Sequence, residues 1–281
     1  MPYPFQLIDV FGEGPFTGNP VAVVTDADEV LDTATMQRIT QWLNLSETTF
    51  LLPPTDMDAD YRVRIFTLER ELPFAGHPTL GTAHAWLAAG GKPKQADRIV
   101  QECGAGLVAL RRDAAGLAFA APPLLRDGPV APDLLAETAE ILGIRADQIV
   151  DASWADNGPG WIAIMLESAD AVLALEPARH FPRRVEIGVV GPHPAGHPIA
   201  WELRAFFSDQ HGGLIEDPVT GSLNASVAQW LFASGRATDR YLAAQGTRLG
   251  RSGRIRVERG DGPLIWIGGH TETLFQGESG F

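Results

Sequence analysis

The sequence predicts an α+β protein made of two similar lobes, each with many short strands around one buried helix. Two charge-free stretches, residues 72–91 and 218–235, are flanked by strand-like segments, and a weak repeat relates the two regions. Each stretch is too long for one strand. Each is also apolar on every side, so a helix formed there must be buried.

The predicted strands come from alternating or β-branched segments. Residues 61–68 (YRVRIFTL) and 201–207 (WELRAFF) alternate in the way that is typical of strands. Further strands are expected at VAVV near residue 22, at TTFLL near residue 50, and in a hairpin over residues 253–260 and 264–269. Residues 134–143 have helical spacing instead.

The repeat is seen when the chain is shifted by 140 positions, which aligns residues 61–82 with 201–222 without a gap. Arg64 then falls on Arg204, and His77 falls on Asp217. The matches fall on prolines, glycines and hydroxyl residues, so a duplicated unit is the economical interpretation.

The proline-rich segment 121–133 is the expected crossover between the lobes. We therefore predict an N-terminal lobe over residues 1–123, completed by a C-terminal strand within 268–281, and a C-terminal lobe over 124–267.

Composition narrows the function classes. The 281 residues can bury a substantial core, and the single cysteine, Cys103, allows no internal disulfide and suits a reducing cytoplasm. No basic leader or membrane-length apolar run is found at the N-terminus. The net charge of -13 argues against nucleic acid and anionic lipid as partners, and an anionic substrate would need strongly local attraction.

That attraction is predicted at two helix starts. The sequence places them near Gly81 and Gly221, where unpaired backbone N–H groups and the hydroxyls of Thr82 and Ser222 could hold a carboxylate. His77 lies just before the first predicted start, and Asp217 is its counterpart before the second. If a pseudo-dyad relates the repeats, both enter one cleft suited to proton transfer. The alternative is that both are structural turn residues.

Glu47 is the candidate acid/base. It is a lone carboxylate beside the apolar segment TTFLL, and desolvation there would raise its pKa toward the range where it can both accept and donate a proton. An exposed glutamate at the end of a strand is an equally weighted alternative.

At these residues the sequence resembles the PhzF-type phenazine-biosynthesis isomerases, relatives of diaminopimelate epimerase. The resemblance is carried by FQLIDVFGEGPFTGNPVAVV at 5–24, LNLSETTFL at 43–51, ELPFAGHPTLGTAHAWL at 71–87, EDPVTGSLNASVAQWL at 216–231 and QGTRLGRSGRIRV at 245–257. It implies a diaminopimelate epimerase-like fold of two pseudo-symmetric lobes, an active site between them and a homodimer.

The resemblance also assigns residues to roles. Glu47 would move the proton, and the other catalytic positions are His77, Asp217 and Ser222. Further candidates for contact with the substrate, from the resemblance and from the sequence, are Asn19, Ser46, Gly76, Gly81, Thr82 and Gly221. The epimerase relatives carry two cysteines where this chain has His77 and Asp217, so a two-thiol mechanism has no reagents here.

Other motifs are set aside. GEGPFTGN at 12–19 is a poor match to a dinucleotide-binding loop. His193 and His197 have ligand-like spacing, but they lie in a proline-rich loop. Cys103 lies outside both candidate site motifs.

The functional prediction is an isomerase without cofactor or metal, acting by proton transfer on a small carboxylated cyclic or unsaturated substrate. Three alternatives remain: a non-catalytic module that binds a small molecule or a protein, an amino-acid epimerase or racemase variant without the thiol pair, and a metal-assisted enzyme.

Overall fold

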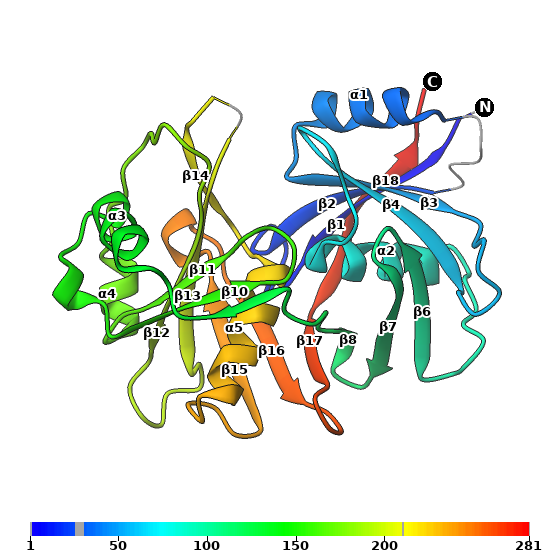
Figure 1. The fold of residues 1–281 in the computed structure, drawn as a ribbon. Coiled ribbons are helices and arrows are strands. Elements are labelled where there is room, and N and C mark those ends of the chain that lie inside the picture. Colours follow the sequence, from blue (N-terminus) through cyan, green and yellow to red (C-terminus); the bar gives the residue numbers. More distant parts are fainter. Residues whose placement is uncertain (1, 26–30, 210, 281) are drawn as a thin grey trace. The chain divides into compact units, whose positions relative to one another are not determined.

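The computed structural model describes residues 2–25, 31–209 and 211–280, and the chain divides into two compact units (Figure 1). The N-terminal unit is Met1–Ala120 with Gly268–Phe281, and the C-terminal unit is Ala121–Ile267. None of the helices among the described residues is long and apolar enough to cross a membrane.

The last strand of the chain belongs to the N-terminal unit and completes its sheet. Its elements are β1 (Pro4–Val10), β2 (Asn19–Val24), α1 (Thr33–Leu43), β3 (Glu47–Leu52), β4 (Tyr61–Thr67), β5 (Glu71–Leu72), α2 (Gly76–Ala88), β6 (Arg98–Cys103), β7 (Gly106–Asp113), β8 (Gly116–Ala120) and β18 (Thr271–Glu278).

The C-terminal unit is continuous in sequence. Its elements are β9 (Arg126–Gly128), α3 (Pro132–Leu142), η1 (Ala146–Gln148), β10 (Asp151–Asp156), β11 (Ile162–Met165), α4 (Ala169–Leu173), β12 (Glu186–Pro192), β13 (Trp201–Ser208), β14 (Leu214–Asp217), α5 (Gly221–Ala233), β15 (Arg240–Gln245), η2 (Thr247–Leu249), β16 (Gly253–Arg259) and β17 (Ile265–Gly269), which runs across the boundary.

The two units pair their strands in the same order and directions. In the N-terminal unit β1 and β2 are antiparallel, β2 and β3 parallel, β3 and β4 antiparallel, and β4 and β6 parallel. The C-terminal unit repeats this pattern with β10, β11, β12, β13 and β15. β9 follows the first repeat and pairs with β10, the first strand of the second repeat. In the same way, β18 follows the second repeat and pairs with β1, the first strand of the first repeat. The predicted duplication is confirmed.

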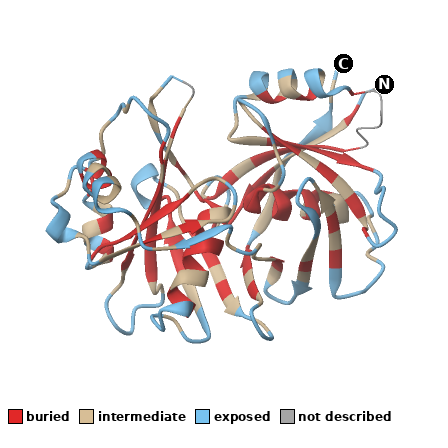
Figure 2. Ribbon diagram, viewed as in Figure 1, coloured by how far each residue is buried: buried red, intermediate tan, exposed pale blue. Residues whose placement is uncertain are grey.

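Each unit has one helix that is buried on nearly all sides. Most of α2 from Gly76 to Ala85, and most of α5 from Gly221 to Phe232, is shielded from solvent, as the red ribbon in Figure 2 shows. α2 contacts β1, β2, β3, β6, β8 and β18 of its own unit, and α5 contacts β10 and β16 of its own. The two charge-free stretches are therefore the central helices that the sequence predicts.

The sheet of the N-terminal unit is also covered on its other face. α1 packs Met36 against Phe50 of β3 and Phe66 of β4, with the rings of the two phenylalanines in edge-to-face contact. A strand covered on both faces is buried throughout, and every residue of β3 after Glu47 is buried. Glu47 is the polar residue with which this buried strand begins.

The gapless alignment of the two repeats is wrong beyond the first strand. Phe66 pairs with Glu71 across the β4–β5 hairpin, and Phe206 pairs with Glu216 across β13–β14. Four residues separate the first pair and nine separate the second, so the second hairpin is five residues longer. In both hairpins the glutamate binds an arginine of the longer strand: Glu71 binds Arg64, and Glu216 binds Arg204. These two arginines are the ones that the shift of 140 positions aligned.

The longer hairpin changes which site residues are equivalent. α2 and α5 begin 145 positions apart (221 minus 76). His77 therefore corresponds to Ser222, each being the second residue of its helix, and Asp217 corresponds to Leu72. The prediction that His77 and Asp217 are counterparts is corrected: the repeat has placed different functional groups at related positions.

Candidate active site

Glu47 stands where α1 ends and β3 begins. Asn44 closes α1 in the left-handed conformation, with φ of 56°, and Ser46 is half-buried in the turn that follows. The backbone of Glu47 lies between Val21 of β2 and Thr67 of β4, so its position is set by the sheet. Its side chain is 16% exposed. The carboxylate is therefore largely shielded from solvent.

His77 brings an imidazole to that carboxylate. It is the second residue of α2, and its side chain is 4% exposed. Nε2 lies 3.4 Å from Oε2 of Glu47, and Nδ1 lies 3.4 Å from Nδ2 of Asn19, the wholly buried first residue of β2. Three separate elements thus bring together Asn19, Glu47 and His77, which we call the N-terminal cluster.

The imidazole is neutral at physiological pH. Burial lowers the pKa of His77 to about 3, outweighing the opposing effect of a hydrogen bond with the Pro20 backbone. The contact with Glu47 is therefore between a carboxyl group and a neutral ring, which offers one N–H donor and one acceptor nitrogen. His77 can orient a neighbouring group through hydrogen bonds, but it supplies no positive charge.

The start of α2 differs from the sequence prediction. The helix begins at Gly76, so Gly81 and Thr82 lie in its second turn. A Cβ added at Gly81 would stand 2.3 Å from Cγ1 of Val21, so the glycine allows close packing of the helix on β2. The Thr82 hydroxyl donates to Oγ1 of Thr49 inside the core. The prediction that a helix start at Gly81 and Thr82 could bind a carboxylate is wrong. The first residue of the helix is Gly76 instead.

The C-terminal unit holds a second group of polar side chains, Asp217, Thr220 and Ser222, which we call the C-terminal cluster. Asp217 ends β14 and is 9% exposed, and its Oδ2 accepts a hydrogen bond of 2.5 Å from Oγ1 of Thr220. Ser222 accepts at Oγ from Nε1 of Trp161, at 3.1 Å, and at its carbonyl from Nδ2 of Asn157, at 2.8 Å.

These contacts give the two functional groups opposite hydrogen-bonding characters. The Asp217 carboxylate is an acceptor. The Ser222 oxygen already accepts from the buried indole of Trp161, so its own proton can be directed to another group. Gly221 is the first residue of α5, where the sequence predicted a helix start.

Two side chains of this environment were missed by the sequence interpretation. Thr220 lies inside the motif EDPVTGS but was assigned no role, although a hydroxyl three residues after an aspartate is a common local hydrogen-bond partner. Trp161 is in the segment NGPGW, which carries no chemical signature, so only the fold shows its contact with Ser222.

Cys103 and the histidine pair have other surroundings. The Cys103 thiol is half-buried, donates to the carbonyl of Gly106 and has its pKa raised by burial. The rings of His193 and His197 stack at 4.4 Å, and His193 binds the buried Glu202. Among residues 2–25, 31–209 and 211–280, no three histidine, cysteine or acidic side chains form a group able to hold a metal ion.

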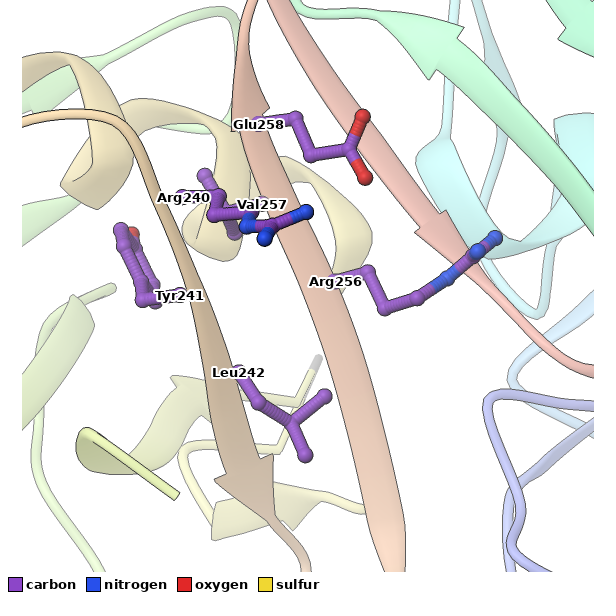
Figure 3. A pocket seen from close by; sticks show the side chains of 6 residues that line it. All are labelled: Arg240, Tyr241, Leu242, Arg256, Val257 and Glu258. Carbon is purple, nitrogen blue, oxygen red and sulfur yellow. The ribbon is translucent and has the colours of Figure 1, made fainter. Parts of the chain in front are cut away.

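A surface hollow on the C-terminal unit includes none of these residues (Figure 3). It is formed by β15 and β16, where Arg240 and Glu258 are cross-strand partners. Its lining residues are Arg240, Tyr241, Leu242, Arg256, Val257 and Glu258. The chemically competent side chains are in the two clusters, and we base the functional argument on them.

Fold and site together define a class of protein: an α+β duplication of the diaminopimelate epimerase-like type, with shielded polar side chains near the starts of its two central helices. The family model described as phenazine biosynthesis-like protein, PhzC-PhzF, matches residues 8–277. The chain belongs to this family.

Relatives in the family carry different names. The chain is 36% identical to antisense-enhancing sequence 1 of Schizosaccharomyces pombe, covering 98% of each protein. It is 35% identical to trans-2,3-dihydro-3-hydroxyanthranilate isomerase of Pseudomonas fluorescens, covering 88% of this chain and 87% of the relative. A solved PhzF-family structure from Enterococcus faecalis is similar with a TM-score of 0.79 and 26% identity over the whole of both chains. The protein is an isomerase of this family.

Proposed function

We propose that the protein is a cofactor-independent isomerase in which Glu47 removes a proton from one carbon of its substrate and returns it to another. The observation that carries the proposal is the 3.4 Å approach of the shielded Glu47 carboxyl to the buried, neutral ring of His77. A proton-transfer group needs reach, shielding and a partner that fixes its orientation, and Glu47 has a sheet-anchored backbone and a buried neighbour.

The choice between the two groups follows from their chemistry. An imidazole with a pKa near 3 is a weak base at neutral pH and is present in neutral form, so it cannot act as a general acid there. The carboxyl is the remaining ionisable group of the N-terminal cluster. His77 then orients the substrate through a hydrogen bond, and Nδ2 of Asn19 lies 3.4 Å from its Nδ1.

Asp217 and Ser222 are proposed as substrate-binding residues of the C-terminal unit. The support is twofold: both residues match site positions in the family resemblance, and the structure gives one an acceptor character and the other an available proton. A substrate that carries a donor and an acceptor near its reacting carbons would satisfy both.

The substrate is proposed to be a small carboxylated cyclic or unsaturated molecule similar to trans-2,3-dihydro-3-hydroxyanthranilate. Relatives that are 34–35% identical are named isomerases of that compound. The net charge of -13 disfavours binding of a substrate carboxylate, so the site needs a local positive field. The start of α2 at Gly76, or that of α5 at Gly221, can supply it through its first amide groups.

The test is isotope transfer from solvent. The enzyme is incubated with trans-2,3-dihydro-3-hydroxyanthranilate in heavy water, and proton and deuterium NMR follow which carbon gains deuterium. The proposal predicts an isomerised product labelled at the carbon that receives the proton. A product without solvent deuterium, formed at full rate over many turnovers, would contradict a proton shuttle that exchanges with water.

A further inference from the structure

A buried hydrogen-bonded side chain stands behind the C-terminal cluster. Gln245, the last residue of β15, is wholly buried. Its Nε2 donates to the carbonyl of Asp217 at 3.1 Å and to Oγ1 of Thr220 at 2.9 Å. Its Oε1 accepts from the backbone N–H of Thr220 at 3.0 Å and from Nδ2 of Asn224 at 2.9 Å. The side-chain amide is thus bonded at both ends.

These partners fix the orientation of the amide. Its oxygen faces two donors and its nitrogen faces a carbonyl and a hydroxyl, so a flipped amide would set N–H groups against N–H groups. Asn224 also donates to the carbonyl of Thr220, which fixes its own amide in the same sense. Gln245 is consequently a donor toward Thr220 and Asp217.

The direction of the Thr220 hydroxyl follows from that orientation. Its oxygen accepts from Gln245, and its single proton is donated to Oδ2 of Asp217 at 2.5 Å. A hydroxyl that already accepts a hydrogen bond is a stronger donor, and a bond to a carboxylate is among the stronger kinds. The result is a directed chain from Gln245 through Thr220 to Asp217.

The side chain of Thr220 does not cap the helix that it precedes. It is the N-cap residue of α5, where a threonine side chain ordinarily accepts from the first helical amides, but no side-chain capping bond is present. A capping bond contributes about 1 kcal/mol to helix stability. The hydroxyl donates to the Asp217 carboxylate instead.

We propose that Gln245 and Thr220 are positioning residues for the isomerase reaction, setting the rotamer and acceptor character of Asp217. The inference rests on the proposed function, in which Asp217 contacts the substrate. Neither residue touches the substrate in this proposal: Thr220 acts through Asp217, and Gln245 acts through Thr220.

The decisive variants are Thr220→Val and Thr220→Ser, measured with trans-2,3-dihydro-3-hydroxyanthranilate. The valine keeps the side-chain shape but loses the hydroxyl. We expect kcat to fall on the order of 10- to 100-fold with KM within about 3-fold, since a hydrogen bond to a charged group is lost and the orientation of the carboxylate with it. Serine restores the hydroxyl, and its kcat should stay within about 3-fold of wild type.

A matched control exists in the other unit. Thr79 is wholly buried in α2 and its hydroxyl accepts from the buried side-chain amide of Gln101, as Thr220 accepts from Gln245. Thr79→Val should lower the melting temperature without lowering kcat per folded molecule. Gln245→Glu provides a second perturbation, because a carboxylate oxygen in place of Nε2 would draw the Thr220 proton away from Asp217. Its kcat should fall like that of Thr220→Val.

The outcomes separate the inference from the proposed function. Wild-type kcat in Thr220→Val, or an equal loss in Thr220→Ser, would overturn the positioning role while the isomerase proposal stands. A wild-type enzyme that produces no isomer and takes up no deuterium would overturn the proposed function, and the positioning role with it.

Discussion

The neutral state of His77 predicts a specific acid sensitivity of the fold. The unfolded chain binds a proton at this histidine below its ordinary pKa of about 6.5, whereas the folded protein excludes it until the pKa of about 3. Between these values the unfolded state binds more protons. The free energy of unfolding therefore falls as the pH falls, by up to about 1.4 kcal/mol per pH unit.

From pH 7 to pH 5 this one group should remove about 2 kcal/mol of stability, because most of the change begins only below pH 6.5. Other groups titrate over the same range, so the prediction concerns a difference between proteins. His77→Gln has no titratable ring. Its stability should fall about 2 kcal/mol less than that of wild type over the same two pH units.

Urea unfolding followed by circular dichroism at pH 7 and pH 5 measures that difference. His197→Gln is the matched control, since it replaces an exposed histidine outside both clusters. Equal losses of stability in wild type and His77→Gln would refute a buried neutral imidazole at this position.

Two further predictions concern single contacts. Gly81→Ala should lower the free energy of unfolding by about 1–3 kcal/mol in urea titrations, because its Cβ would stand 2.3 Å from Val21. Gly14→Ala is the control and should not lower it, because a Cβ there has nothing within 4 Å. Equal effects of the two variants would contradict the packing argument. Trp161→Phe keeps an aromatic side chain, although a smaller one, and removes the N–H that is donated to Ser222. We expect kcat to fall on the order of 10-fold in the isomerase assay, and an unchanged kcat would show that the indole hydrogen bond does not orient the serine.

Much of the fold can be predicted from the sequence because its signals are large. Two uncharged stretches long enough for a helix can only be central helices, and the strand patterns around them repeat. The predicted helix start near Gly221 agrees with the structure, whereas α2 begins five residues before the start predicted near Gly81. The segment GHPTLGT at 76–82 contains two glycines, and only the structure shows that Gly81 lies within the helix, where it allows close packing on Val21.

The register of the repeat could not be found from identities alone. The β13–β14 hairpin is five residues longer than the β4–β5 hairpin, partly because its strands stay paired as far as Ser208 and Leu214. The length of a hairpin end is weakly constrained, and the matching prolines and glycines conceal the shift. The structure resolves it through strand pairing and through the two arginine–glutamate pairs. This is why His77 corresponds in structure to Ser222 and not to Asp217.

The supporting side chains were beyond sequence reasoning for a related reason. Gln245 lies in the motif QGTRLG, but its four hydrogen bonds are made with Asp217, Thr220 and Asn224, which lie 21 to 28 residues earlier in the chain. Only the folded backbone shows that a glutamine of β15 reaches the cap of α5. The role of such a residue is visible from contacts and not from its type.

The central claim is that the Glu47 carboxyl moves the proton. The most direct measurement compares Glu47→Gln with Glu176→Gln, whose side chain is 80% exposed, for turnover and solvent deuterium uptake with trans-2,3-dihydro-3-hydroxyanthranilate. Glu47→Gln should lose on the order of 100- to 10,000-fold in kcat and in deuterium uptake while the substrate still binds, and Glu176→Gln should match wild type. Wild-type turnover and labelling in Glu47→Gln would contradict the account.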